Sequence, residues 1–234
     1  MANRDGVFGM LMGAAIGMCS IVLACGPPAS CAGLSISSPL EDLTRCAELG
    51  DAGAQGNLGW MYATGEGVPK DDAEAVRWYR LAAEQGYASA QYNLGFMYAT
   101  GQGVPEDDAE AARWYRLAAE QGLAEAQAYL GGMYANGEGV PEDDTESVRW
   151  YRLAAEQGFA VAQSYVGAMY ASGEGVPEDL VYARMWFNLS ATQGNETAQG
   201  NKEIVEQRMT PEQIAEAQRL STEWLEAHPQ DGGN

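Results

Sequence analysis

Residues 51–86 read DAGAQGNLGWMYATGEGVPKDDAEAVRWYRLAAEQG, and close copies of this stretch follow at 87–122, 123–158 and 159–194. Self-similarity with a constant period of 36 residues is typical of proteins that stack one structural unit many times. Each unit buries its apolar surface against its neighbours instead of in a separate core. The sequence therefore predicts an elongated array.

Each repeat contains two apolar-periodic stretches separated by a glycine-rich turn. In the first, from Ala54 to Ala63, apolar residues recur at spacings of three and four, which predicts a helix with one buried stripe. In the second, from Ala73 to Glu84, alanines permit close helix packing and the pair Trp78-Tyr79 supplies buried area. We predict an all-α fold of antiparallel helix pairs.

The turn between the helices has its own recurring chemistry. The segment Gly65-Glu66-Gly67-Val68-Pro69 combines glycines suited to positive φ with a proline that stops a helix. Asp71 and Glu74 then form a D-x-x-E pattern, which predicts a capped start of the second helix, and Gly86 predicts its C-terminal cap. A calcium loop is the alternative role for these acids, although they lack the alternating spacing of an EF-hand.

Shorter units flank the array. Residues 33–50 are expected to form a linker and an N-terminal capping helix from Leu40 to Gly50, with Leu43, Cys46 and Leu49 on its apolar side. Residues 195–227 keep the register but replace the glycine turn by Met209-Thr210-Pro211-Glu212, which predicts C-terminal capping helices. Residues 228–234 form a polar tail.

Residues 1–32 have the composition of an export leader. Arg4 precedes an apolar stretch from Val7 to Ala24, and Gly26-Pro27-Pro28 breaks any helix after it. Ser30-Cys31-Ala32 places small residues where a signal peptidase cuts, and cleavage after Ala32 would leave Cys46 as the only cysteine. We expect an exported protein, periplasmic or secreted.

Two other fates of the leader remain open. Val22-Leu23-Ala24-Cys25 resembles a lipoprotein signal, so that lipidation of Cys25 would anchor the protein to a membrane. An uncleaved leader would also act as an anchor. All three fates place the repeats outside the cytoplasm.

The charge and the scarcity of histidine limit the function classes. A formal charge of −20 and a pI near 4.2 oppose binding to nucleic acid and to anionic lipid surfaces. His228 is the only histidine and lies in the tail, and the paired acids recur in cap positions. We therefore expect no enzyme, no cofactor and no metal site.

The repeat resembles a known family. Ala54, Leu58-Gly59, Met61-Tyr62, Gly67-Val68-Pro69 and Ala82-Ala83-Glu84-Gln85-Gly86 match the pattern of the Sel-one-like repeat, a relative of the tetratricopeptide repeat. The resemblance implies a right-handed superhelical solenoid that assembles or localises protein complexes. It names no partner and leaves the oligomeric state open.

A binding surface is expected at positions that vary between repeats but share one helix face. Offsets of three and four place such a stripe on the first helices, and we predict that it lines a concave groove. The candidate partner-binding residues are Asn57, Trp60, Asn93, Phe96, Tyr129 and Tyr165. The alternative is that Trp60 and Phe96 only pack between adjacent helices as core.

These observations favour a scaffold without a chemical step that holds a protein or peptide in its groove. A second hypothesis is a module that binds a cell-envelope glycan such as peptidoglycan. In that case the aromatic rings would stack on sugars and the amides of Asn57 and Asn93 would bond hydroxyls.

Overall fold

The structure is a computed structural model that describes residues 31 and 33–229. Within that part of the chain every regular element is a helix, which confirms the predicted all-α fold. The helices are α1 (Leu40–Glu48), α2 (Ala52–Thr64), α3 (Asp72–Glu84), α4 (Ala88–Thr100), α5 (Asp108–Glu120), α6 (Ala124–Asn136), α7 (Asp144–Glu156), α8 (Ala160–Ser172), α9 (Leu180–Thr192), α10 (Glu196–Glu206) and α11 (Pro211–Ala227).

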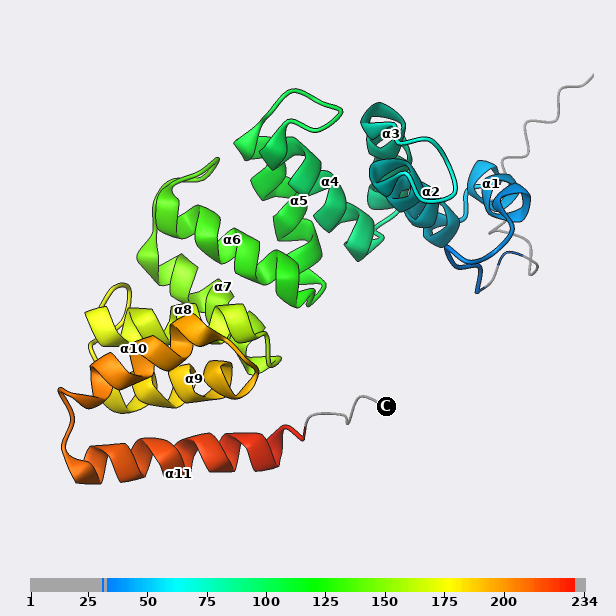
Figure 1. Cartoon of the computed structure of the whole chain (residues 1–234). Coiled ribbons are helices and arrows are strands. Elements are labelled where there is room, and N and C mark those ends of the chain that lie inside the picture. Colours follow the sequence, from blue (N-terminus) through cyan, green and yellow to red (C-terminus); the bar gives the residue numbers. More distant parts are fainter. Residues whose placement is uncertain (1–30, 32, 230–234) are drawn as a thin grey trace, which may run out of the picture.

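The central helices form a regular solenoid. We call α2, α4, α6 and α8 the A helices, and α3, α5, α7 and α9 the B helices. Each A helix packs against the B helix of its own repeat, and each of the first three B helices packs against the A helix of the next repeat. The pairs follow one another along an arc from α1 at one end to α9, α10 and α11 at the other (Figure 1).

Within each repeat a B-helix aromatic ring lies directly on a glycine of the A helix. A Cβ atom built on Gly95 would lie 3.0 Å from the ring of Tyr115, and one on Gly59 would lie 2.6 Å from the ring of Tyr79. Only a residue without a side chain allows this approach. The other pairs in this relation are Gly131 with Tyr151 and Gly167 with Phe187.

A ladder of glutamine side chains joins successive repeats. The buried Gln91 of α4 donates through Nε2 to the carbonyl of Ala83, in the last turn of α3, at 3.1 Å. Its own Oε1 accepts a bond of 2.7 Å from Gln121, at the end of α5. Each buried glutamine thereby satisfies a helix-end carbonyl and ties three consecutive helices together. Gln55, Gln127 and Gln163 make the same pair of bonds.

The turn glycines make the second contact between repeats. Gly65 and Gly67 have φ of +79° and +76°, as the turn pattern predicted. In the next repeat a Cβ on Gly103 would lie only 2.2 Å from the carbonyl oxygen of Asp72, at the start of the preceding B helix. Gly139 and Gly175 are equally close to Asp108 and Asp144. The turn therefore packs backbone to backbone on the preceding repeat.

The predicted helix caps are confirmed in part. Asp71 Oδ1 accepts hydrogen bonds from the backbone N–H groups of Ala73 and Glu74, and Gly86 has φ of +88°. The Glu74 carboxylate does not reach back to complete a capping box, because it pairs with Arg77 at 3.0 Å instead. The acids of this turn thus have structural partners, and no group of metal-ligating acids forms among the described residues.

The ends of the array differ from its middle. Helix α1 covers α2 with Leu43 and Cys46 buried, as predicted, whereas Leu49 is exposed because it lies at the C-cap. Thr210 and Gln213 form a capping box at the start of α11, which confirms the predicted helix start. The main neighbour of α11 is α9 instead of α10, so the last helix does not repeat the regular pairing.

A buried ion pair supports this end. Arg184 of α9 donates from Nε to Glu206 of α10 at 2.7 Å, and its side chain is almost fully buried. Trp224 of α11 meets Trp186 of α9 edge to face, with 6.3 Å between ring centroids. Arg184 stands where the first repeat has Val76, and Glu206 and Trp224 lie outside the four repeats, so the register alone does not predict these contacts.

The interpretation of residues 1–30 as part of a leader, including lipidation at Cys25, lies outside the described residues, as do residues 230–234 of the polar tail. None of the helices from residue 40 onward combines the length and apolarity needed to cross a bilayer.

The turn contacts predict unequal effects of two neighbouring substitutions. Gly137→Ala places alanine at φ +69° without a close neighbour, and should cost about 1 kcal/mol of unfolding free energy from backbone strain alone. Gly139→Ala has a similar φ, but its Cβ would lie 2.1 Å from the carbonyl oxygen of Asp108. We expect Gly139→Ala to lower the unfolding free energy by about 2 kcal/mol more than Gly137→Ala does. Urea unfolding of both variants measures the difference, and equal stabilities would contradict the backbone contact.

Candidate functional site

The face of the A helices carries the stripe of variable residues predicted from the sequence, and this face is hollowed in two main places. The first hollow, of about 450 Å³, lies between the N-terminal segment and the first two repeats. Asn57, Trp60 and Asn93 line it, together with Leu34, Ser35, Ile36, Gly56, Tyr79, Tyr87, Ser89 and Ala90. The structure thus brings three of the six candidate residues together here.

The chain itself occupies part of this first hollow. Asn57 donates through Nδ2 to the carbonyl of Leu34 at 3.1 Å, so its amide already has a partner within the protein. Trp60 is half-buried and packs against two core clusters, one shared with the N-terminal cap and one shared with the second repeat, which fits the packing alternative, and it also lines the hollow. Phe96 is exposed and lines neither main hollow. A partner-binding role for these residues stays a prediction.

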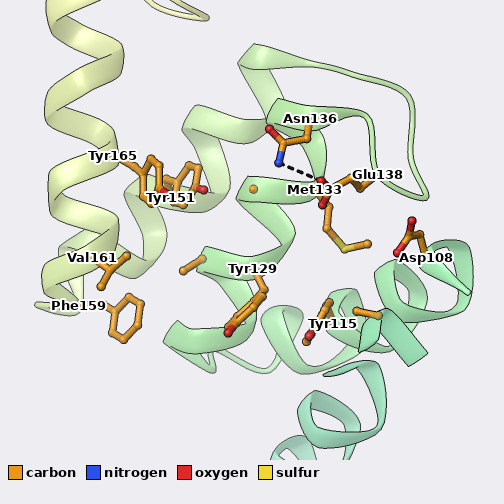
Figure 2. Close-up of a pocket in the computed structure, with 13 residues that line it drawn as sticks. Asp108, Tyr115, Tyr129, Met133, Asn136, Glu138, Tyr151, Phe159, Val161 and Tyr165 are labelled. Atoms are coloured by element: carbon orange, nitrogen blue, oxygen red, sulfur yellow. Dashed lines mark hydrogen bonds between the residues drawn. The ribbon is translucent and has the colours of Figure 1, made fainter. Parts of the chain in front are cut away.

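The second hollow, which we call the tyrosine pocket, has a volume of about 460 Å³ and is lined by residues of the second, third and fourth repeats. Tyr129 and Tyr165, the other two candidates, form its walls (Figure 2). The remaining lining residues are Ala99, Asp108, Tyr115, Ala128, Gly132, Met133, Asn136, Glu138, Tyr151, Phe159 and Val161.

Two pairs of stacked tyrosines build the pocket. Tyr129 stacks on Tyr115 with 5.2 Å between ring centroids, and Tyr165 stacks on Tyr151 at 4.7 Å. The outer ring of each pair is exposed, at 45% for Tyr129 and 50% for Tyr165, whereas the inner ring is buried. The inner rings are the same ones that lie on the A-helix glycines, so the repeat packing holds the two outer rings in place.

The pocket exists because, at two positions of the stripe, large and small side chains change places between the first two repeats and the last two. The first two repeats carry the large Trp60 and Phe96 where the last two carry Gly132 and Ala168. A Cβ on Gly132 would lie 3.0 Å from the hydroxyl of Tyr151, so the small residue leaves that space open. Large residues instead stand one helical turn earlier, at Tyr129 and Tyr165.

The buried tyrosines are held neutral. Burial raises the pKa of Tyr115 and Tyr151 far above the usual range, and nearby tyrosines add to the effect. Burial also raises the pKa of Tyr92 to about 12, with smaller contributions from Tyr129 and Glu125. The hydroxyl of Tyr115 is buried at the pocket without a hydrogen-bond partner among the described residues.

One end of the pocket is acidic. Asp108 and Glu138 are the only charged side chains among its lining residues, and they lie on the same side of it (Figure 2). Asn136 donates through Nδ2 to Glu138 Oε1 at 3.2 Å. The site thus combines exposed aromatic faces with carboxylates and an amide. Aromatic faces and carboxylates both attract cations.

Sequence reasoning recovered the walls of this pocket and missed its floor. Tyr115 and Tyr151 belong to the consensus aromatic pair, for which the sequence predicts a packing role. They do pack, and they also line the pocket from beneath. The available signal was the small residue Gly132, which lies at the pocket in the position that Trp60 and Phe96 occupy in the earlier repeats. Asp108 and Glu138 were hidden in cap and turn positions.

The single histidine lies away from both hollows. His228 lies at the exposed end of α11, where its ring stacks on Trp224 at 4.3 Å between centroids. It is far along the chain from the tyrosine pocket. Within residues 31 and 33–229, no cluster of three or more histidine, cysteine or acidic residues is arranged to hold a metal ion.

Comparison with known families identifies the repeat. The family model described as Sel1 repeat matches four times, at residues 52–87, 88–123, 124–159 and 160–195. These matches coincide with the four pairs of A and B helices. A comparison with curated protein sequences gives no match.

Solved structures of similar proteins share the fold. A Sel1 repeat protein from Oxalobacter formigenes has 40% sequence identity and a TM-score of 0.65 over 70% of this chain and 48% of its own. A protective antigen of uropathogenic Escherichia coli strains that displays an SLR fold has 30% identity and a TM-score of 0.54, over 80% of this chain and 48% of its own. The chain spans about half the length of each.

The buried tyrosines predict a loss of stability at alkaline pH. Because their pKa is higher in the folded than in the unfolded protein, their contribution is complete below about pH 10 and declines as the pH rises above it. Tyr115→Phe should reduce this decline. At neutral pH it should change the unfolding free energy by less than about 1 kcal/mol, because the hydroxyl has no partner and Phe187 fills the equivalent position.

Tyr134→Phe is the control, since the Tyr134 hydroxyl accepts a bond of 2.6 Å from Arg116. This variant should lose about 1 kcal/mol already at neutral pH. Urea unfolding at pH 7, 9 and 10.5 measures both effects. An unchanged alkaline slope for Tyr115→Phe would contradict the predicted ionisation of the buried ring.

Proposed function

Because the chain belongs to the Sel1 repeat family, whose fold is a protein-interaction scaffold that is generally non-catalytic, we propose that it binds a peptide segment of another protein on its A-helix face. The observation that carries this proposal is the tyrosine pocket, a preformed hollow with two exposed rings fixed from behind. Rigid aromatic side chains bind partners with little loss of conformational entropy, and they are frequent interaction hot spots.

We further propose that the bound segment presents a basic side chain. Tyr129 and Tyr165 offer exposed ring faces, and Asp108 and Glu138 supply negative charge beside them. No arginine or lysine lines the pocket. The B-helix arginines are engaged elsewhere, as Arg113 shows: it pairs with Glu110 and lies over the ring of Trp114. The overall charge of −20 also attracts cationic partners at long range.

An arginine-containing peptide tests this proposal. The probe is an unstructured peptide with spaced arginines, and its control is the same peptide with citrulline, which keeps the shape and removes the charge. By isothermal titration we expect the arginine peptide to bind at least about tenfold more tightly. Replacing both Tyr129 and Tyr165 by leucine should weaken binding of the arginine peptide about tenfold. Replacing both by phenylalanine should not weaken it, because the rings remain.

A matched pair of charge variants separates the pocket from the general field of the protein. Glu138→Gln changes the pocket, and Glu120→Gln makes the same charge change at the exposed end of α5. Only Glu138→Gln should weaken binding of the arginine peptide. Equal binding of the citrulline peptide, or equal effects of the two glutamine variants, would refute pocket recognition. Binding of soluble peptidoglycan fragments without peptide binding would instead support the glycan hypothesis.

A further inference from the structure

The first described residues belong to the folded domain. Cys31 is only 2% exposed and lies in the same apolar cluster as Leu43, Leu58 and Trp78. Leu34 packs against this cluster and accepts the hydrogen bond from Asn57. The segment before α1 therefore covers the N-terminal end of the array and contributes one wall of the first hollow.

A disulfide bond fixes this segment to the capping helix. Cys31 is joined to Cys46, which is fully buried on α1, with 5.6 Å between the Cα atoms. That separation is typical of a disulfide. The bond closes a loop with a sequence separation of 15 residues, which restricts the unfolded chain and thereby stabilises the cap.

The bond conflicts with the cut after Ala32 that the sequence suggested. That cut removes Cys31, leaves Cys46 as a buried thiol without its partner, and takes away a side chain that fills the cluster. We propose that Cys31 remains in the mature protein, that any cleavage of the leader occurs on its N-terminal side, and that the Cys31–Cys46 bond forms in an oxidising compartment outside the cytoplasm. Structural disulfides persist in such compartments.

The chemistry requires an oxidant, which we assign to a protein thiol–disulfide oxidoreductase of the export compartment. One of the two thiols, after losing its proton, attacks the oxidoreductase disulfide and forms a mixed disulfide. The second thiolate then attacks this intermediate, which forms the Cys31–Cys46 bond and releases the oxidoreductase as a dithiol. Two cysteine thiols lose two electrons and two protons, and the oxidoreductase disulfide gains them.

The test is the covalent structure of the exported protein. The full chain with its own leader is produced in a Gram-negative host with an intact periplasmic oxidation system and is purified through a C-terminal tag. We expect intact mass to place the N-terminus before Cys31, and non-reducing peptide mapping to show Cys31 linked to Cys46. A mature chain beginning at Gly33, or alkylation of Cys46 without prior reduction, would overturn the proposal.

Sequence variants sharpen the result. Ala32→Leu removes the small residue that a cut at this position needs, so it should leave the mature N-terminus unchanged. Cys31→Ser, Cys46→Ser and the double variant should lower the melting temperature by similar amounts, roughly 5–10 °C, because each breaks the same bond. A Cys31→Ser variant as stable as the parent, with Cys46→Ser alone destabilised, would show that the bond is absent.

Discussion

The fold depends on an aromatic ring that lies on a glycine. In every repeat a B-helix ring touches the A-helix backbone, as Tyr79 touches Gly59, where a Cβ atom would lie only 2.6 Å from the ring. This contact sets the distance between the two helices of a repeat. The glutamine ladder and the turn glycines then set the distance between repeats. Together these contacts leave the A-helix face free to vary.

The tyrosine pocket uses the same contacts for a second purpose. Tyr115 and Tyr151 hold the helices together with one face and support Tyr129 and Tyr165 with the other. The proposed site is therefore preorganised without any dedicated supporting residues. At the variable stripe position of the third repeat, Gly132 leaves open the space beside the hydroxyl of Tyr151. The side chains that line the A-helix face can thus change along the array while the packing stays the same.

Periodicity predicted the repeats, the helix ends and the stripe that lines the hollows, because each of these depends on local sequence. The sequence does not predict the position of α11. Its side chains Leu220, Trp224 and Leu225 pack on the apolar cluster that includes α9, and the repeat register does not encode this tertiary contact. The sequence does not predict the disulfide, because the leader pattern extends over Cys31. The sequence does not predict the glutamine ladder. Identity between the repeats indicates that the glutamines are needed, but it does not show which carbonyl each side chain binds.

The joints between the repeats are chemically alike, since Gly103, Gly139 and Gly175 each meet the start of the preceding B helix in the same way. A gene segment of 36 codons could therefore be duplicated or deleted without altering any joint, and the product would keep its caps. Insertions of other lengths would break the ladder. Evolution can therefore change the length of the array in whole repeats, independently of the side chains that line each hollow.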